Sequence, residues 1–462
     1  MPRRRRTGET VRERPAARFL RGWARIAVRV LVRRLDVSGL DRIPVDRPVV
    51  LAANHTNALA DVAVIVALAP RFPRFLATAT WLRWAPARAL FRLAAVVPVH
   101  RRRDGDPARN EQSFAACHAA LAAGDHLAIF PEGEMHLGPA LLPLRTGAAR
   151  IALGAALGAD VRGVVIVPVG LVYDPGGLFT TVAELHVGEP IEVDDWLDRA
   201  RGDEVTAVRE LTDDLAARLT AVTVNDSSAA ASRLIDRVAG LALADDADHP
   251  DDVPLARRSV LRRALGRAVE EGGGERGPVF AELAAAVAAH EEALAALGLD
   301  PASALPVLAP PPAVDRVRRR VRLAVRAPVA TIGAAANAPT LALMAIAQRR
   351  VRRAGWRLTV LGVGATVVSP VVWSVERSLL ARRIGSGRAT ALVAAGALAA
   401  PVAVAWSHDV SRMRAYRWFD RAEVSHPGAV AVADRTRVEV RRRVSALVGV
   451  RARAGVNGAD RP

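Results

Sequence analysis

The chain has 462 residues, 51% of them hydrophobic, and carries a net charge of +18 at pH 7. This length exceeds one ordinary hydrophobic core, so two or three structural units are expected. All 65 basic residues are arginine, aromatic residues make up only 4%, and no zinc-finger spacing occurs, so the charge favours a membrane surface over nucleic acid as partner. Cys117 is the only cysteine, which excludes a disulfide framework and a cysteine-based metal site, and we expect no bound metal.

The chain begins with a basic segment. Residues 1–34 hold twelve arginines against two glutamates, and from Phe19 to Leu35 apolar residues recur at helical spacing with arginine on the opposite face. This pattern predicts an amphipathic helix in a bilayer interface, to which we assign residues 1–40. The alternative is a helix that packs against the protein's own core.

Short apolar runs then alternate with helix-compatible stretches. The runs cover 48–53, 94–99, 127–130 and 163–169, and one strand or two short strands cover 181–193. Runs that are apolar on both faces suit central strands of a parallel sheet covered by helices. Residues 41–224 are therefore predicted to form an α/β domain with a mainly parallel central sheet.

The next segment is alanine-rich and helical in pattern. It covers residues 225–315 and ends in a proline-rich stretch, 300–315, that forbids continuous helix and indicates a linker. It shows no residue pattern that indicates chemistry.

Three apolar stretches follow an arginine cluster, at 327–348, 358–375 and 389–407. The second and third are free of charge and about long enough to cross a bilayer. We therefore assign residues 316–420 to a helical region with a membrane hairpin, and 421–462 to a basic C-terminal tail. A buried hairpin in a soluble domain is the alternative. If both helices cross, the two ends of the protein lie on the same side.

The stretch "NHTNALAD" follows the strand predicted at 48–53 and contains His55 and Asp61. The carboxyl end of a strand that leads into a helix is a common position for catalytic residues. Six residues of regular helix rotate through about 600°, so the two side chains meet only if the segment begins as a turn. If they meet, the aspartate fixes the tautomer of the imidazole, whose other nitrogen can then take a proton from an alcohol. A capping aspartate beside a surface histidine is the plainer interpretation.

A second polar stretch, "FPEGEMH", follows the strand predicted at 127–130. It places Glu132 and Gly133 where backbone amides near a helix start can hold an anion. Arg145 lies a few residues on, before a predicted helix, and Arg101 and Arg102 follow the strand that ends in "VVPV". Guanidinium groups suit bidentate contacts with phosphate, although each also fits a solvated surface.

Four stretches in this order resemble the four sequence blocks of the glycerolipid acyltransferases, the family of lysophosphatidate and glycerol-3-phosphate acyltransferases. They are "NHTNALAD", "VVPVHRRRDG", "IFPEGEMHLGPALLPLRTGAARIAL" and "VIVPVGLVY". The resemblance covers about residues 15 to 220. It implies that His55 is the general base and Asp61 its orienting acid, that Arg101, Glu132 and Gly133 bind the glycerol phosphate, and that Val167–Val169, with Pro168, helps to shape the acyl site.

The chain departs from the family pattern at several positions. Five residues rather than four separate His55 from Asp61, a spacing we associate with a sub-branch that includes fungal glycerol-3-phosphate acyltransferases and that also carries a C-terminal membrane hairpin. Met135 stands where that sub-branch has serine, although His136 is kept. The usual T-R-S ending of the third block is missing, so Arg145 or Arg102 becomes the candidate for its phosphate contacts. Asn54 and His136 are further candidates.

The resemblance implies transfer of a fatty acyl group from acyl-CoA or acyl-carrier protein to glycerol 3-phosphate or 1-acyl-sn-glycerol 3-phosphate, in phospholipid biosynthesis. No cofactor beyond the acyl donor is expected, and no acyl-enzyme, because no G-x-S-x-G elbow occurs. Membrane lipids are the expected surroundings, with the catalytic domain on the cytoplasmic face of the cell membrane. The alternatives are an acyltransferase for another lysolipid or glycolipid, and a membrane-binding protein without catalysis.

Overall fold

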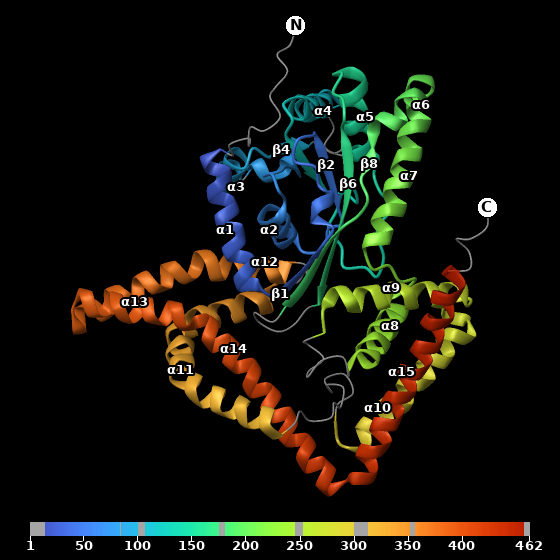
Figure 1. Cartoon of the computed structure of the whole chain (residues 1–462). Coiled ribbons are helices and arrows are strands. Elements are labelled where there is room, and N and C mark those ends of the chain that lie inside the picture. Colours follow the sequence, from blue (N-terminus) through green and yellow to red (C-terminus); the bar gives the residue numbers. More distant parts are fainter. Residues whose placement is uncertain are drawn as a thin grey trace.

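The computed structural model describes residues 14–83, 85–99, 107–174, 181–244, 253–299, 313–351 and 356–456, and it centres on an eight-stranded sheet (Figure 1). The strands are β1 (Val32–Ser38), β2 (Val49–Ala53), β3 (Arg74–Thr78), β4 (Val97–Val99), β5 (His126–Ile129), β6 (Val165–Asp174), β7 (Thr181–Val187) and β8 (Ile191–Glu192).

The strand order is β1-β7-β6-β2-β5-β3-β4, with β8 paired to β6. All pairs are parallel except those of β6 with β7 and with β8. The mainly parallel sheet expected from the apolar runs is therefore confirmed. Two strands were not foreseen, because β1 was assigned to the first helix and the run "RFLAT" of β3 is short and begins with arginine.

Helices cover both faces of the sheet. Alternate residues of β2 enter two separate cores: Val49 and Leu51 pack with α1 (Pro15–Leu31) and α2 (Ala58–Leu68), while Val50 packs on the opposite face. The opposite face is covered by α4 (Pro107–Ala122), α5 (Gly147–Gly158), α6 (Leu197–Gly202) and α7 (Glu204–Val222). Every residue of β2 is buried, as expected for a central strand.

Helix α1 packs against the protein's own core, which was the alternative interpretation of its sequence. Arg21 is buried and donates to the carbonyl oxygens of Val66 and Ala69, so a cation of α1 caps the carboxyl end of α2. The outer face still exposes Phe19 and Ile26. The helix ends at Leu31 rather than Leu35, because the following residues pair with β7 as strand β1.

The helices after the sheet form a bundle that includes the end of the chain. Helices α8 (Ala229–Ala242), α9 (Leu255–Glu271) and α10 (Pro278–Ala296) pack around a common core with α15 (Pro427–Val456). The basic tail expected over 421–462 was therefore wrong in its described part, since Val440 and Val444 of α15 are buried between these helices. The expected proline-rich linker lies mostly outside the described residues.

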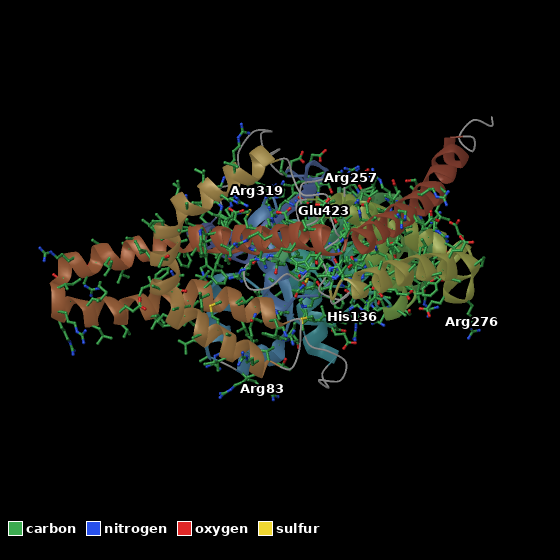
Figure 2. The ribbon with its side chains drawn as sticks, turned by 90° about the horizontal axis from the view of Figure 1, so that it is seen from below. Arg83, His136, Arg257, Arg276, Arg319 and Glu423 are labelled. Atoms are coloured by element: carbon green, nitrogen blue, oxygen red, sulfur yellow. The ribbon has the colours of Figure 1, made fainter. Side chains whose placement is uncertain are left out.

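Within the described residues, three helical segments between α10 and α15 are long and apolar enough to cross a membrane: Arg316–Arg350, Thr359–Ile384 and Ser386–Arg414. They belong to α11 (Ala313–Arg350), to α12 (Arg357–Val363) with α13 (Ser369–Ile384), and to α14 (Ser386–Ser425). Helices α13 and α14 form a hairpin that projects from the body, and Figure 2 shows it at the opposite end of the molecule from Arg276. Most of their residues are exposed, as suits helices that contact lipid.

Candidate active site

The loop between β2 and α2 brings His55 against Asp61. Strand β2 ends at Ala53, and α2 begins only at Ala58, so the intervening residues turn the chain before the helix starts. The Nδ1 atom of His55 lies 2.9 Å from Oδ2 of Asp61. The turn that was required for these side chains to meet is present.

The carboxylate of Asp61 is fully buried and accepts several hydrogen bonds. Its Oδ2 atom also accepts hydrogen bonds from the backbone N–H groups of Thr56 and Asn57, at 2.8 Å each. An ionised carboxylate only accepts, so the proton of the imidazole lies on Nδ1 and its Nε2 is left as an acceptor. The ring stacks on Phe130, with centroids 4.0 Å apart, which fixes its plane.

Asn54 ties this loop to the neighbouring strand. Its side-chain amide donates to the carbonyl of Leu171, and its side-chain oxygen accepts from the N–H of the same residue, at 2.9 and 2.7 Å. These two bonds extend the pairing of β2 with β6 by one step beyond Ala53. The two bonds therefore hold Asn54, the residue immediately before His55, in place.

Glu132 supports the same loop from the other side. One carboxylate oxygen accepts from the backbone N–H of His55 at 2.8 Å, and the other accepts from the N–H of Leu142 at 3.1 Å. The side chain is buried, and the backbone N–H of His136 also donates to the carbonyl of His55. The two oxygens of Glu132 thus hold the loop that carries His55, and the phosphate contact expected of this residue stays a prediction.

His136 is engaged within its own loop. Its Nε2 lies 2.7 Å from the carbonyl oxygen of Ala140, so this nitrogen donates, and Nδ1 lies 3.4 Å from Glu132.

Gly133 and Arg145 are in direct contact. Gly133 has a φ of +75°, and a Cβ atom added there would lie 2.2 Å from Nε of Arg145. The same Nε donates to the carbonyl of Glu132 at 3.3 Å. Glycine is therefore required for the arginine to lie across the turn, and this leaves the terminal guanidinium nitrogens of the exposed Arg145 without a partner in the described part of the chain.

Two side chains that the sequence did not single out for the site reach the amino end of α2. The N–H of Ala58 donates to the sulfur of Met135, and the N–H of Leu59 donates to the hydroxyl oxygen of Thr359 in α12, both at 3.1 Å. Ala58 has a φ of +33°, a strained value for a residue with a side chain. No signal in the sequence joins Thr359 to this loop, because the contact depends on how the helices pack.

The remaining candidates lie elsewhere. Pro168 is buried in β6 beside Ala52, on the face of the sheet opposite α2, whereas Val167 and Val169 face α2. Arg101 and Arg102 lie outside the described residues, directly after β4.

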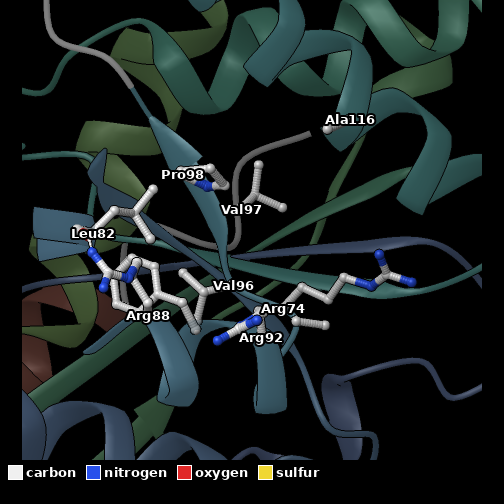
Figure 3. Close-up of a pocket in the computed structure, with 10 residues that line it drawn as sticks. Arg74, Leu82, Arg88, Arg92, Val96, Val97, Pro98 and Ala116 are labelled. Atoms are coloured by element: carbon white, nitrogen blue, oxygen red, sulfur yellow. Dashed lines mark hydrogen bonds between the residues drawn. The ribbon is translucent and has the colours of Figure 1, made fainter. Parts of the chain in front are cut away.

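A cavity of about 580 Å³ opens at the β3–β4 edge of the sheet, beside α3 (Ala85–Leu93). Figure 3 shows its apolar wall, which includes Val96 and Val97, with Arg88 and Arg92 from α3 around it. Arg74 also lines it but is paired with Asp125 at 2.5 Å. The cavity thus combines an apolar surface with cationic groups.

Burial raises the pKa of the Cys117 thiol to about 12, so this residue does not supply a thiolate nucleophile at neutral pH.

The chain is similar to known proteins over part of its length. Residues 34–172 match the family model described as Acyltransferase. Glycerol-3-phosphate O-acyltransferase 2 of Saccharomyces cerevisiae is 40% identical over 85 residues, which cover 18% of this chain and 11% of the yeast protein. Glycerol-3-phosphate O-acyltransferase 1 of the same yeast is 37% identical over 110 residues, which cover 23% of this chain and 14% of the yeast protein.

Among solved structures, the 1-acyl-sn-glycerophosphate acyltransferase PlsC from Thermotoga maritima aligns with a TM-score of 0.31 and 20% sequence identity. The alignment covers 42% of this chain and 79% of that one.

A mainly parallel sheet, with a histidine and an aspartate joined after its central strand, carries the sequence blocks of enzymes that transfer acyl groups. Residues 34–172 match the acyltransferase family model, and the resemblance to glycerolipid acyltransferases read from the four blocks is confirmed over this part of the chain. The match spans only about a tenth to a seventh of the two yeast enzymes.

Proposed function

We propose that the protein transfers a fatty acyl group from a thioester, acyl-CoA or acyl-carrier protein, to a hydroxyl of glycerol 3-phosphate or 1-acyl-sn-glycerol 3-phosphate. The observation that carries this proposal is the bond between His55 and the buried carboxylate of Asp61, which leaves Nε2 of the imidazole as a base.

In the proposed reaction, Nε2 of His55 takes the proton of the acceptor hydroxyl as the oxygen attacks the thioester carbonyl. The carbon–sulfur bond breaks, and the thiolate leaves with the proton that the imidazolium returns. Asp61 keeps its negative charge and stabilises the imidazolium between these steps. No covalent acyl-enzyme forms.

The phosphate of the acceptor needs cations, and Arg145 offers terminal guanidinium nitrogens beside the loop that contains Glu132. Arg101 and Arg102 are proposed as further phosphate ligands from the segment after β4. The protein is proposed to act at the cell membrane, with its catalytic domain facing the cytoplasm and with α13 and α14 in the lipid.

In the test, the purified full-length protein is supplied with one of three labelled acceptors: glycerol 3-phosphate, lysophosphatidate or a lysolipid without a terminal phosphate. Each acceptor is combined with acyl-CoA or with acylated acyl-carrier protein as the donor. We expect acylation of a phosphorylated acceptor, and a fall of 10²- to 10⁴-fold in rate for His55→Ala with unchanged binding to vesicles. Substantial activity in His55→Ala contradicts the mechanism. Acylation of the lysolipid alone contradicts the proposed acceptor, and thioester hydrolysis that does not depend on acceptor indicates a hydrolase.

A further inference from the structure

Two buried polar atoms close to the His55–Asp61 pair have no hydrogen-bond partner among the described residues. One is Oδ1 of Asp61, the carboxylate oxygen that does not contact His55, and the other is the hydroxyl oxygen of Tyr173. Buried polar groups in native proteins are nearly always hydrogen-bonded, so such a pair calls for an explanation. One atom is an acceptor, and the other is a donor.

Strand β6 brings the tyrosine to the carboxylate. Tyr173 follows Leu171 by two residues, and side chains two apart in a strand point to the same face. That face is covered by α2, since Leu171 and Val64 share one core and Tyr173 packs against it. Asp61 lies on α2 and is fully buried there.

The electrostatics agree with this placement. Burial raises the pKa of the Tyr173 phenol well above its ordinary value, and the carboxylate of Asp61 raises it further. Tyr173 is therefore a neutral hydroxyl that retains its proton at working pH. An effect of this kind means that the phenol and the carboxylate lie close together.

The other titratable groups around the pair are accounted for. Glu132 and His136 approach from the loop after β5, and both carboxylate oxygens of Glu132 already accept backbone N–H groups. Arg21 and Arg25 of α1 contact the opposite end of α2. Of these groups, the hydroxyl of Tyr173 is the donor that fits Oδ1 of Asp61.

We infer that Tyr173 is a positioning residue of the active site, whose hydroxyl donates to Oδ1 of Asp61 and thereby fixes the carboxylate that orients His55. The inference rests on the proposed acyl transfer. It also gives α9, a helix that follows the sheet in sequence, a role in supporting the strand that carries Tyr173. The next residue, Asp174, pairs with Arg258 of α9 at 2.6 Å, so α9 holds the end of β6 that carries Tyr173.

The test is Tyr173→Phe, which removes one oxygen and keeps the ring. Without the hydroxyl, the charge on Asp61 is less stabilised, so the imidazolium of His55 persists to higher pH. We expect kcat to fall about tenfold with an unchanged KM, and the acid limb of the kcat profile to move up by about one pH unit. The control is Thr212→Val in α7, which removes a buried hydroxyl bonded to the carbonyl of Val208 and should leave the profile in place.

A double-mutant cycle separates this role from packing. In the Asp61→Asn background, Tyr173→Phe should change the residual rate by less than about twofold, because the group through which it acts is altered. A tenfold loss that persists in that background, or an acid limb that stays in place in Tyr173→Phe, overturns the inference.

A readout without catalysis distinguishes failure of this inference from failure of the proposed function. NMR of histidine-labelled protein, with the His55 signal assigned by His55→Ala, should show His55 titrating about one pH unit higher in Tyr173→Phe. If no acceptor is acylated but this shift is seen, the proposed function fails and the positioning role holds. If acylation is seen and the titration does not move, the positioning role fails.

Discussion

The hydroxyl oxygen of Thr359 accepts a hydrogen bond from the backbone N–H of Leu59 at 3.1 Å, although 300 residues separate the two in the chain. Thr359 lies near the start of an apolar segment, and Leu59 lies in the first turn of α2, four residues after His55. Leu361 and Met344 from the same apolar region also enter the core beneath the sheet. Helix α12, which leads into the hairpin proposed to enter the membrane, is therefore packed against the segment that carries His55.

This contact predicts that Thr359→Val lowers both the stability and the activity of the protein. The variant leaves the N–H of Leu59 without its acceptor, so we expect a loss of about 1 kcal/mol and a fall in kcat of about fivefold, with Thr359→Ser close to wild type. The control is Thr366→Val, because that hydroxyl bonds to Gly362 within its own helix. Equal activity of Thr359→Val and wild type in lipid vesicles contradicts the prediction.

Gly133→Ala tests the contact between the turn and Arg145. A matched control exists in Gly124→Ala, since both glycines have a φ of +75° but a Cβ at Gly124 meets nothing within 4 Å. We expect both variants to lose about 1 kcal/mol from the left-handed backbone, and only Gly133→Ala to displace Arg145 and raise the KM for a phosphorylated acceptor. Melting temperature and KM are the measurements, and an equal KM in both variants argues against a phosphate role for Arg145.

Glu132→Gln distinguishes support of the loop from direct contact with substrate. Glutamine keeps one acceptor but sets an NH₂ group against a backbone N–H, so stability should fall by about 1–3 kcal/mol and kcat should fall with it. The exposed Glu134→Gln is the control and should behave as wild type. A raised KM with unchanged kcat and unchanged melting temperature instead indicates that Glu132 contacts the acceptor.

Packing of α10 against α15 restricts the number of membrane crossings. Both helices lie in one core, so the chain before α11 and after α14 is on one side, and an odd number of crossings is excluded. Met344, in the last turns of α11, lies in the core beneath the sheet. We therefore predict that Thr359–Ile384 and Ser386–Arg414 cross and Arg316–Arg350 does not.

Membrane-impermeant thiol labelling of sealed vesicles measures this topology, with the buried Cys117 as a silent background. Ser386→Cys and Ser425→Cys, at the two exposed ends of α14, should label from opposite sides. Labelling of both from the same side is incompatible with a crossing α14.

The buried side chain of His126 makes the stability of the protein depend on pH. Burial lowers the pKa of this histidine in β5 to about 4, and the positive charge of Arg71 contributes in the same direction. In the unfolded chain this histidine has a pKa of about 6.5. Its contribution to the free energy of unfolding is therefore complete above that pH and is lost as the pH falls toward 4, by about 3 kcal/mol.

Denaturant unfolding between pH 7.5 and pH 4.5 checks this decline, with His126→Phe as the comparison. The variant should lose markedly less stability over this range than wild type. Parallel curves for the two proteins disagree with a buried neutral His126.

The sequence determined the α/β class because apolar runs bounded by turns are a local pattern, and four of those runs became β2, β4, β5 and β6. It also placed His55 and Asp61 at the end of a strand, since a turn between them is encoded by neighbouring residues. Helices 358–375 and 389–407 were foreseen for the same reason, as length and lack of charge require no knowledge of packing.

Tertiary structure alone decided which distant groups complete this site. No local sequence pattern indicates the contacts of Thr359 and Tyr173, because a hydroxyl side chain is the same residue whether it meets solvent or another segment. The same holds for the buried face of α15, since an amphipathic helix does not show in its own sequence which segment it packs against. The role of Glu132 was obscured similarly, since its family block names the residue but not the amides that its two oxygens bind. Long-range contacts form because many weak interactions between distant segments add up when the chain packs, and a single stretch of sequence does not specify them.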